Sequence, residues 1–201
     1  MRHWLLRLML LLLWIETSEV NAQTHKLVED VDDRHSEYLH VTIGVGYEYL
    51  THAYGKDGLS LDLTARYYFG DRFFGAAKTQ YGLHSGSKTI QPKKDKSKLY
   101  DDVTTWTFMG GAGYDLWQNS TCDFVVYAQG LVGYGGYADK YEVYTNGVHT
   151  RRKTYKGIAA DLSIGSEYTS RSNFLFGING DAIYVGRRMN FAVSISMGYL
   201  F

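Results

Sequence analysis

The sequence is poor in the two residues that most constrain a polypeptide chain, proline and cysteine. One proline, Pro92, and one cysteine, Cys122, occur among 201 residues. Because a single cysteine cannot form an intramolecular disulfide, the fold must be stabilised in another way. Proline is excluded from the interior of a β-sheet, so its scarcity permits long uninterrupted strands. The lone proline falls in a polar stretch, where it would interrupt none of them.

The chain also lacks net charge and, after its first residues, any long apolar run. Lysine plus arginine and aspartate plus glutamate number 21 each, so the formal net charge is zero. Bulk electrostatics therefore gives no argument for a nucleic-acid partner. No later apolar run approaches the roughly 18 residues that a transmembrane helix requires, which argues against a helical membrane protein.

The N-terminus differs from the rest of the chain. Residues 1–15, MRHWLLRLMLLLLWI, place Arg2 and Arg7 beside a short apolar core, and a polar stretch follows. This pattern is typical of a signal peptide, here with cleavage after Ala22, although an amphipathic or buried helix is the alternative. The expected organisation is a signal peptide over 1–22, a flexible periplasmic segment over 23–36 and one folded domain over 37–201.

Tyrosine and glycine are abundant, with 18 and 22 residues. From Glu37 onward, apolar residues alternate with small or polar ones at period two, which predicts about eight strands. The final segment, FAVSISMGYLF, shows the alternation most clearly, whereas the phase of the fifth strand is ambiguous. The predicted strands span residues 37–49, 58–69, 73–84, 102–116, 123–136, 156–169, 173–185 and 191–201.

Eight alternating strands can close with the apolar face inward, as in a soluble ligand carrier, or outward, as in a membrane barrel. Three features favour the membrane barrel. The second face is rich in Gly, Ser and Thr, which fit the narrow lumen of eight strands. Aromatic residues gather at both ends of the apolar face and flank an aliphatic band. Short connections alternate with two long polar ones, residues 85–100 and 138–155, which we interpret as outer loops.

We therefore predict an all-β fold, an eight-stranded antiparallel up-and-down transmembrane β-barrel whose last strand pairs with its first. Over residues 37–201 the chain resembles small bacterial outer-membrane barrels of the outer-membrane protein X and protein A transmembrane type. The most specific element is the terminal strand, with Phe201 last and Tyr199 two residues before it. The resemblance implies the outer membrane of a Gram-negative bacterium. It also implies that Tyr199 and Phe201 form an assembly signal read by the barrel-assembly machinery.

We expect the lumen to hold a packed polar network rather than an open pore. Unpaired charges in a narrow lumen are costly, so they should pair with one another or bind water. A gated proton or ion path is the alternative use of the same residues. The predicted network consists of Glu48, Asp62, Arg66, Lys78, Asp161, Glu167 and Asp181.

Basic residues crowd the two long connections, and tyrosines accompany them in the second. Such loops suit contacts with phosphate-rich lipopolysaccharide or with another anionic surface ligand. We expect a non-enzymatic, monomeric surface protein that serves adhesion or membrane integrity, without a cofactor, a metal or a nucleic-acid partner. The predicted binding residues are Lys88, Lys93, Lys94, Lys96, Lys98, Arg151, Arg152 and Lys153.

A lipid A-modifying hydrolase of the deacylase kind is the rival function, and a soluble periplasmic carrier is the third. For the hydrolase, His84 with Ser85 or Ser87 is the best local candidate. Such chemistry needs a base within hydrogen-bond reach of the nucleophile. Adjacent residues of a strand point to opposite faces, which argues against His84 with Ser85.

Overall fold

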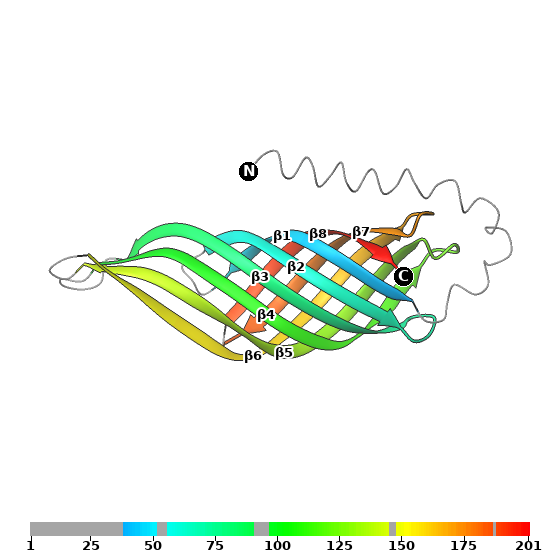
Figure 1. The fold of residues 1–201 in the computed structure, drawn as a ribbon, viewed down its shortest axis with the longest axis horizontal. Helices are drawn as coiled ribbons and strands as arrows, with labels where there is room; N and C mark the ends of the chain where they lie inside the picture. Colours follow the sequence, from blue (N-terminus) through cyan, green and yellow to red (C-terminus); the bar gives the residue numbers. More distant parts are fainter. Residues whose placement is uncertain (1–37, 52–55, 91–96, 145–147, 187) are drawn as a thin grey trace. The chain divides into compact units, whose positions relative to one another are not determined.

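A computed structural model describes residues 38–51, 56–90, 97–144, 148–186 and 188–201, so the predicted signal peptide and periplasmic segment lie outside the described residues. The described residues form a closed antiparallel barrel whose strands pair in sequence order (Figure 1). The eight-stranded up-and-down barrel predicted from the sequence is therefore confirmed. The strands are β1 (Leu39–Leu50), β2 (Lys56–Tyr68), β3 (Phe73–Ile90), β4 (Ser97–Gln118), β5 (Phe124–Tyr144), β6 (Val148–Thr169), β7 (Phe174–Val185) and β8 (Arg188–Leu200).

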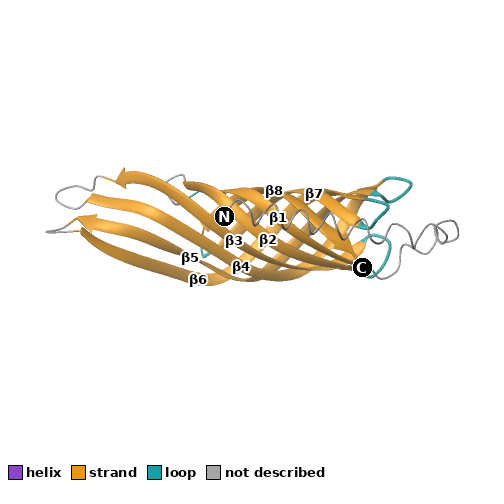
Figure 2. Cartoon of the chain, turned by 45° about the horizontal axis from the view of Figure 1, so that its top comes forward, coloured by secondary structure: helices purple, strands orange, loops and turns teal. Residues whose placement is uncertain are grey.

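Among these residues there is no helix with the length and apolarity needed to cross a bilayer. Figure 2 shows strands joined by loops throughout the described part of the chain.

The seam between β1 and β8 closes the barrel along its whole length. The register runs from His40 opposite Leu200 to Leu50 opposite Asn190. The final residue also takes part, because the Phe201 N–H donates to the carbonyl of Leu39 at 2.9 Å. Closure pairs the backbone groups that an open edge strand would leave exposed, which a lipid environment requires. This pairing explains why the period-two pattern continues to the last residue.

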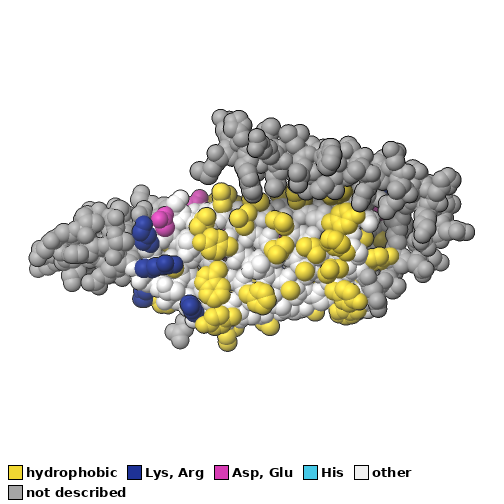
Figure 3. All heavy atoms as spheres, viewed as in Figure 1, with side chains coloured by type: hydrophobic (Ala, Val, Ile, Leu, Met, Phe, Trp, Pro, Cys, Tyr) yellow, Lys and Arg dark blue, Asp and Glu magenta, His cyan; other side chains and the backbone are white. Residues whose placement is uncertain are grey.

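The two faces of each strand differ as the sequence predicts: the apolar face points outward, and the face with small or polar residues points into the barrel. On β1, Ile43 is 59% exposed, whereas its neighbour Thr42 is 3% exposed and points into the barrel. Figure 3 shows hydrophobic side chains spread in a band over the visible outer surface. A soluble protein does not expose an apolar surface of this extent, so the band faces lipid and the barrel spans a membrane. The soluble-carrier alternative is wrong, because it requires the apolar face to point inward.

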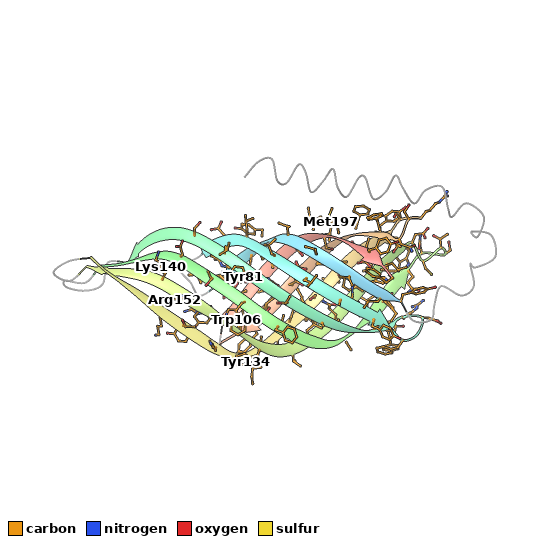
Figure 4. All side chains as sticks on the ribbon, in the orientation of Figure 1. Tyr81, Trp106, Tyr134, Lys140, Arg152 and Met197 are labelled. Carbon is orange, nitrogen blue, oxygen red and sulfur yellow. The ribbon has the colours of Figure 1, made fainter. Side chains whose placement is uncertain are left out.

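Aromatic side chains border the aliphatic band at both ends, as predicted. At the outer end, Tyr81 and Trp106 are register partners, and the Trp106 ring lies 5.9 Å from that of Tyr134. Figure 4 shows these three side chains on the outside of neighbouring strands. At the other end, the Phe73 and Tyr114 rings lie 4.7 Å apart. These are the positions of the aromatic girdles at the two interfaces of a membrane.

The prediction of two long outer loops is wrong. β3 and β4 stay paired out to Ile90 opposite Lys98, and β5 and β6 out to Tyr144 opposite Val148. β4 and β5 also pair with each other over this stretch. The result is a four-stranded sheet that continues beyond the neighbouring strands, and Figure 1 shows it at the left. We call it the outer wall, defined as residues 85–90, 97–103, 137–144 and 148–157.

The physical reason for the error lies in composition. The segments that form the outer wall are dense in Lys, Arg and Asp, which are typical of loops, yet they also carry Thr, Val and Tyr, which favour strands. Pairing with the neighbouring strands continues the sheet through these segments.

The lumen is not uniformly polar. β5 turns Val125, Tyr127 and Leu131 inward, where they pack with Phe74 and Met109. The phase that the sequence leaves ambiguous is thereby fixed, and the residues of this strand that point outward are Phe124, Val126, Ala128, Val132 and Tyr134. The interior therefore combines an apolar cluster with polar layers.

Candidate functional sites in the lumen and on the outer wall

An ion pair between β2 and β6 forms the first polar layer of the lumen. The Arg66 guanidinium bonds to the Glu167 carboxylate, and both side chains are almost fully buried. His40 Nδ1 lies 2.8 Å from the other carboxylate oxygen of Glu167. The guanidinium also lies 4.3 Å from the centroid of the Tyr127 ring, a cation–π contact. These contacts link β1, β2, β5 and β6 across the interior.

A lysine surrounded by carboxylates forms the second layer. Lys78 Nζ lies 3.0 Å from Asp161 and 2.8 Å from Asp181. Ser163 donates its hydroxyl hydrogen to Asp161 at 2.9 Å. Asp62, which is also buried, interacts electrostatically with Lys78 and Asp181. One cation therefore lies between carboxylates from two strands, β6 and β7.

A single carboxylate organises the third layer. Glu48 accepts hydrogen bonds from Asn190 at 2.8 Å, Thr105 at 3.2 Å and Gln80 at 3.4 Å. His84 Nε2 lies 3.5 Å from the same carboxylate. All five side chains are buried. The seven acidic and basic residues predicted for the lumen thus lie inside the barrel and within reach of polar partners, an arrangement that suits a packed network.

Of the two serines proposed as partners of His84 in the hydrolase hypothesis, the structure describes the side chain of Ser85 alone. His84 is buried and its Nδ1 lies 3.2 Å from the carbonyl oxygen of Val103. Ser85 is exposed on the opposite face of β3, and the side chain of Ser87 lies outside the described residues. No described serine hydroxyl is hydrogen-bonded to His84.

The outer wall divides the predicted basic patch between two faces. Because β6 is a strand here, Arg152 and Lys153 point to opposite sides. Lys153 lies 4.6 Å over the ring of Tyr155, on the inward face. Lys93, Lys94 and Lys96 lie outside the described residues, as do the side chains of Lys88, Lys98 and Arg151. The patch predicted as two loops is therefore, where it is described, a two-sided sheet.

On the outward face, basic residues lie directly beyond the apolar band. Lys140 and Arg152 are register partners. Ile158 of β6 is exposed to lipid. Lys156, two residues before it, points to the same face of the strand and lies closer to the outer end. Figure 4 shows Lys140 and Arg152 beyond the girdle residues, and Figure 3 shows cations at that end of the band.

On the inward face of the outer wall, two tyrosine side chains stack on each other. The Tyr137 and Tyr155 rings lie 4.6 Å apart at 29°. The Arg188 guanidinium lies 3.8 Å over Tyr137 and bonds to Asp139 at 3.2 Å. Leu50 and Val103 pack against Tyr137. Arg188, the first residue of β8, thus connects the two tyrosines to Asp139.

Several residues of these sites could not be predicted from the sequence. Asn190, Thr105, Gln80 and Tyr127 are neutral, so they give no charge signal. Each contacts a charged partner far away in the sequence, and only the strand register brings the two together.

The single cysteine lies in the short turn between β4 and β5. Burial raises the pKa of the Cys122 thiol, which favours the protonated, unreactive form. Within the described part of the chain, no three His, Cys, Asp or Glu side chains are arranged to hold a metal ion.

Comparison with known proteins supports the architecture. No protein-family model matches the chain, and no curated protein matches its sequence. The structure of Ail, the attachment invasion locus protein of Yersinia pestis, in complex with the heparin analogue sucrose octasulfate is similar. It has 14% identity and a TM-score of 0.57, over 83% of this chain and 99% of that chain.

Neisserial surface protein A is also similar, with 14% identity and a TM-score of 0.53, over 80% of this chain and 96% of that chain. The chain has the fold of a small outer-membrane β-barrel. An apolar band facing outward on such a barrel belongs in the outer membrane of a Gram-negative bacterium.

Proposed function

We propose that the protein is a non-enzymatic outer-membrane protein that binds phosphate groups of lipopolysaccharide on the outward face of its outer wall. In this role it supports membrane integrity. The observation that carries the proposal is the position of Lys140, Arg152 and Lys156 directly beyond the apolar band and its aromatic girdle.

The geometry suits an anion held at the membrane surface. The three cations project from paired strands, so less chain entropy is lost on binding than for residues of a flexible loop. The Lys140 side chain is 50% exposed, and its ion pair with Asp102 is long at 3.9 Å. Trp106 and Tyr134 lie at the interface just below. A phosphate above the girdle would therefore meet several cations at once.

Adhesion to a sulfated surface ligand is the second candidate function. Its support is the likeness in fold to Ail, a protein whose structure was determined with a heparin analogue. In this chain, Lys153 and Arg188 offer cations beside Tyr137 and Tyr155 on the inward face. These residues differ from those that serve the lipid, so the two functions are separable.

The proposal includes a monomeric state and assembly by the barrel-assembly machinery. Phe201 is 68% exposed at the end of the seam, and the Tyr199 ring lies 5.1 Å from it. Both rings therefore lie on the outer surface, where a recognition factor could reach them before the barrel is inserted in the membrane.

The test compares the triple variant Lys140→Gln, Arg152→Gln, Lys156→Gln with the wild-type protein in detergent micelles. Binding of purified lipopolysaccharide should fall at least about tenfold, and the difference should shrink at high salt because salt screens exposed charges. Lys153→Gln is the matched control, since it removes one cation from the opposite face. Unchanged binding by the triple variant would overturn the proposal, as would an equal loss in the control.

Enzymatic activity is tested separately. Mass spectrometry of lipid A from cells with and without the protein should show the same acyl chains. A shifted pattern that His84→Ala abolishes would replace this proposal with the hydrolase.

A further inference from the structure

The third polar layer of the lumen differs from the other two, because its carboxylate has no permanent cation beside it. In the first layer Arg66 pairs with Glu167, and in the second Lys78 lies between two carboxylates. Glu48 is 1% exposed, yet no described lysine or arginine lies within ion-pair distance of it. A buried carboxylate without a positive partner is costly. The one ionisable side chain that the structure places beside Glu48 is His84, so this pair has to resolve the charge.

Both ring nitrogens of His84 face oxygen atoms that accept hydrogen bonds. Nδ1 lies 3.2 Å from the carbonyl oxygen of Val103, and a carbonyl cannot donate, so Nδ1 carries a hydrogen. Nε2 is buried without a hydrogen-bond donor, and the Glu48 carboxylate lies 3.5 Å from it. A neutral imidazole has a single N–H and would turn a lone pair toward this carboxylate. One additional proton, carried by Nε2 or by Glu48, removes the conflict.

A glycine of β3 makes room for the pair. A methyl group on Gly82 would collide with the Glu48 carboxylate and the Thr105 hydroxyl. It would also lie 2.6 Å from the His84 ring. The three side chains can therefore converge inside the barrel only because this position has no side chain of its own.

The other groups around the pair do not supply a charge. Neutral groups from four strands contact it: Gly58 of β2, Gln80 of β3, Thr105 of β4 and Asn190 of β8. The charged groups of the adjoining layers have partners of their own, since Asp139 bonds to Arg188 at 3.2 Å and Lys78 contacts two carboxylates. Burial raises the pKa of the Tyr137 hydroxyl, which therefore stays protonated at neutral pH. Protonation at this level of the lumen thus depends on Glu48 and His84.

We propose that Glu48 and His84 form a binding site for one proton, and that this proton controls how firmly Tyr137 is held on the inward face of the outer wall. Val103 is the link, because it is the register partner of His84, accepts a hydrogen bond from the ring and packs against Tyr137. When the proton leaves, one N–H remains for two acceptors, and the charged carboxylate is the stronger acceptor. The hydrogen then moves to Nε2, and the Val103 carbonyl loses its donor.

The effect has a fixed sign. The folded barrel keeps a proton that the unfolded chain releases near neutral pH, so folding should weaken as pH rises. Where only the folded state holds the proton, the equilibrium constant for unfolding should rise by up to about tenfold per pH unit. The contact between Val103 and Tyr137 should be firm in acid and looser in base. The outward face of the wall, which we propose binds lipopolysaccharide, does not contact this site and should not respond to it.

The test uses NMR of the full-length protein, labelled with ¹⁵N and dissolved in detergent micelles, from about pH 5 to about pH 9, a range that brackets histidine titration. In the wild type, the hydrogen on Nδ1 of His84 should be present in acid and move to Nε2 in base. Glu48→Gln can donate an amide hydrogen to Nε2, so Nδ1 should keep its hydrogen throughout. Amide exchange at Tyr137, expressed as a protection factor, should fall with rising pH in the wild type only. His40→Gln, the matched control, removes another lumen histidine and should leave the His84 transition in place.

Each alternative has a distinct outcome. Retention of the Nδ1 hydrogen at high pH in the wild type would overturn the shared proton, as would an identical transition in Glu48→Gln. A His84 transition that leaves the protection of Tyr137 unchanged would overturn the link to the wall. If Glu48→Gln does not fold, His84→Gln takes its place, and its Tyr137 protection should not depend on pH. The triple variant that tests lipopolysaccharide binding should keep the His84 transition, so this inference and the proposed function can fail separately.

Discussion

The interior of the barrel and the outer wall differ in how their charged residues are placed: those of the interior are buried and paired, and those of the wall are exposed. Inside, Lys78 is 3% exposed and contacts two carboxylates within 3.0 Å. On the wall, the Lys140 side chain is 50% exposed and its carboxylate partner lies 3.9 Å away. The same period-two pattern separates lipid from lumen in the barrel, but at Arg152, Lys153 and Thr154 of β6 in the wall it separates two surfaces that are both exposed to water.

The difference teaches where stability and binding reside. A buried charge is tolerated only with its partner, and loss of the partner costs several kcal/mol. An exposed ion pair contributes little, so the residue is available for a ligand. We therefore expect lumen substitutions to affect unfolding, and wall substitutions to affect binding.

The largest effect is expected for Lys78→Met. Without the ammonium group, Asp161 and Asp181 become buried carboxylates with no cation between them. The variant should lose about 3–5 kcal/mol of unfolding free energy at pH 7. Urea titration in detergent micelles, followed by the heat-modifiable shift on a gel, measures it.

The pH dependence sharpens this prediction. A buried carboxylate requires a cation only while it is charged, so the deficit of Lys78→Met relative to the wild type should shrink as pH falls. A deficit that stays constant from pH 7 to pH 4 would mean that lost packing, rather than charge, is responsible.

The sequence predicts the phase of the lumen residues but not their partners. Alternation along β2 places Arg66 inside, because Ala65 and Tyr67 must face lipid. It cannot select Glu167, since that choice depends on the register that β2 and β6 adopt through the intervening strands.

The outer wall escapes prediction for a different reason. Inside the barrel one face is lipid, so the pattern is enforced by the hydrophobic effect. In the wall both faces of a strand such as β6 meet water, and its alternation of Arg152, Lys153 and Thr154 carries no hydrophobic contrast. Residues of this composition are therefore interpreted as a loop, although the barrel rim extends the strands through them.

A smaller effect is expected for Gly165→Ala. A methyl group there would meet the Asn179 side chain and lie 2.7 Å from the Tyr127 ring. Overpacking of this kind should cost about 1–3 kcal/mol in the same urea titration. Gly180→Ala is the matched control, because the nearest atom to its added methyl group is 3.9 Å away. A comparable loss in both variants would attribute the effect to the backbone instead of the lumen.

Deletion of Phe201 should have a still smaller effect on stability and a clearer one on assembly. It removes two backbone hydrogen bonds to Leu39, worth about 1 kcal/mol each. If the terminal residues also form the assembly signal, the insertion yield in cells should fall more than for Phe69→Ala, a girdle variant. Equal yields for the two variants would reduce Phe201 to an ordinary girdle residue.

The smallest effect on stability is expected for Lys140→Gln. This variant tests whether the exposed charges of the outer wall contribute to binding without contributing to stability. The side chain is half exposed and its ion pair is long, so unfolding free energy should change by less than about 0.5 kcal/mol. Lipopolysaccharide affinity should nevertheless fall, and more at low salt than at high salt, because an exposed cation acts through a screened field. Lys78→Met should show the reverse: its unfolding free energy should fall strongly, while its folded form should bind lipopolysaccharide with normal affinity. If Lys140→Gln instead destabilises the barrel by as much as a lumen variant, the wall is a structural extension of the barrel, and its charges are not reserved for a ligand.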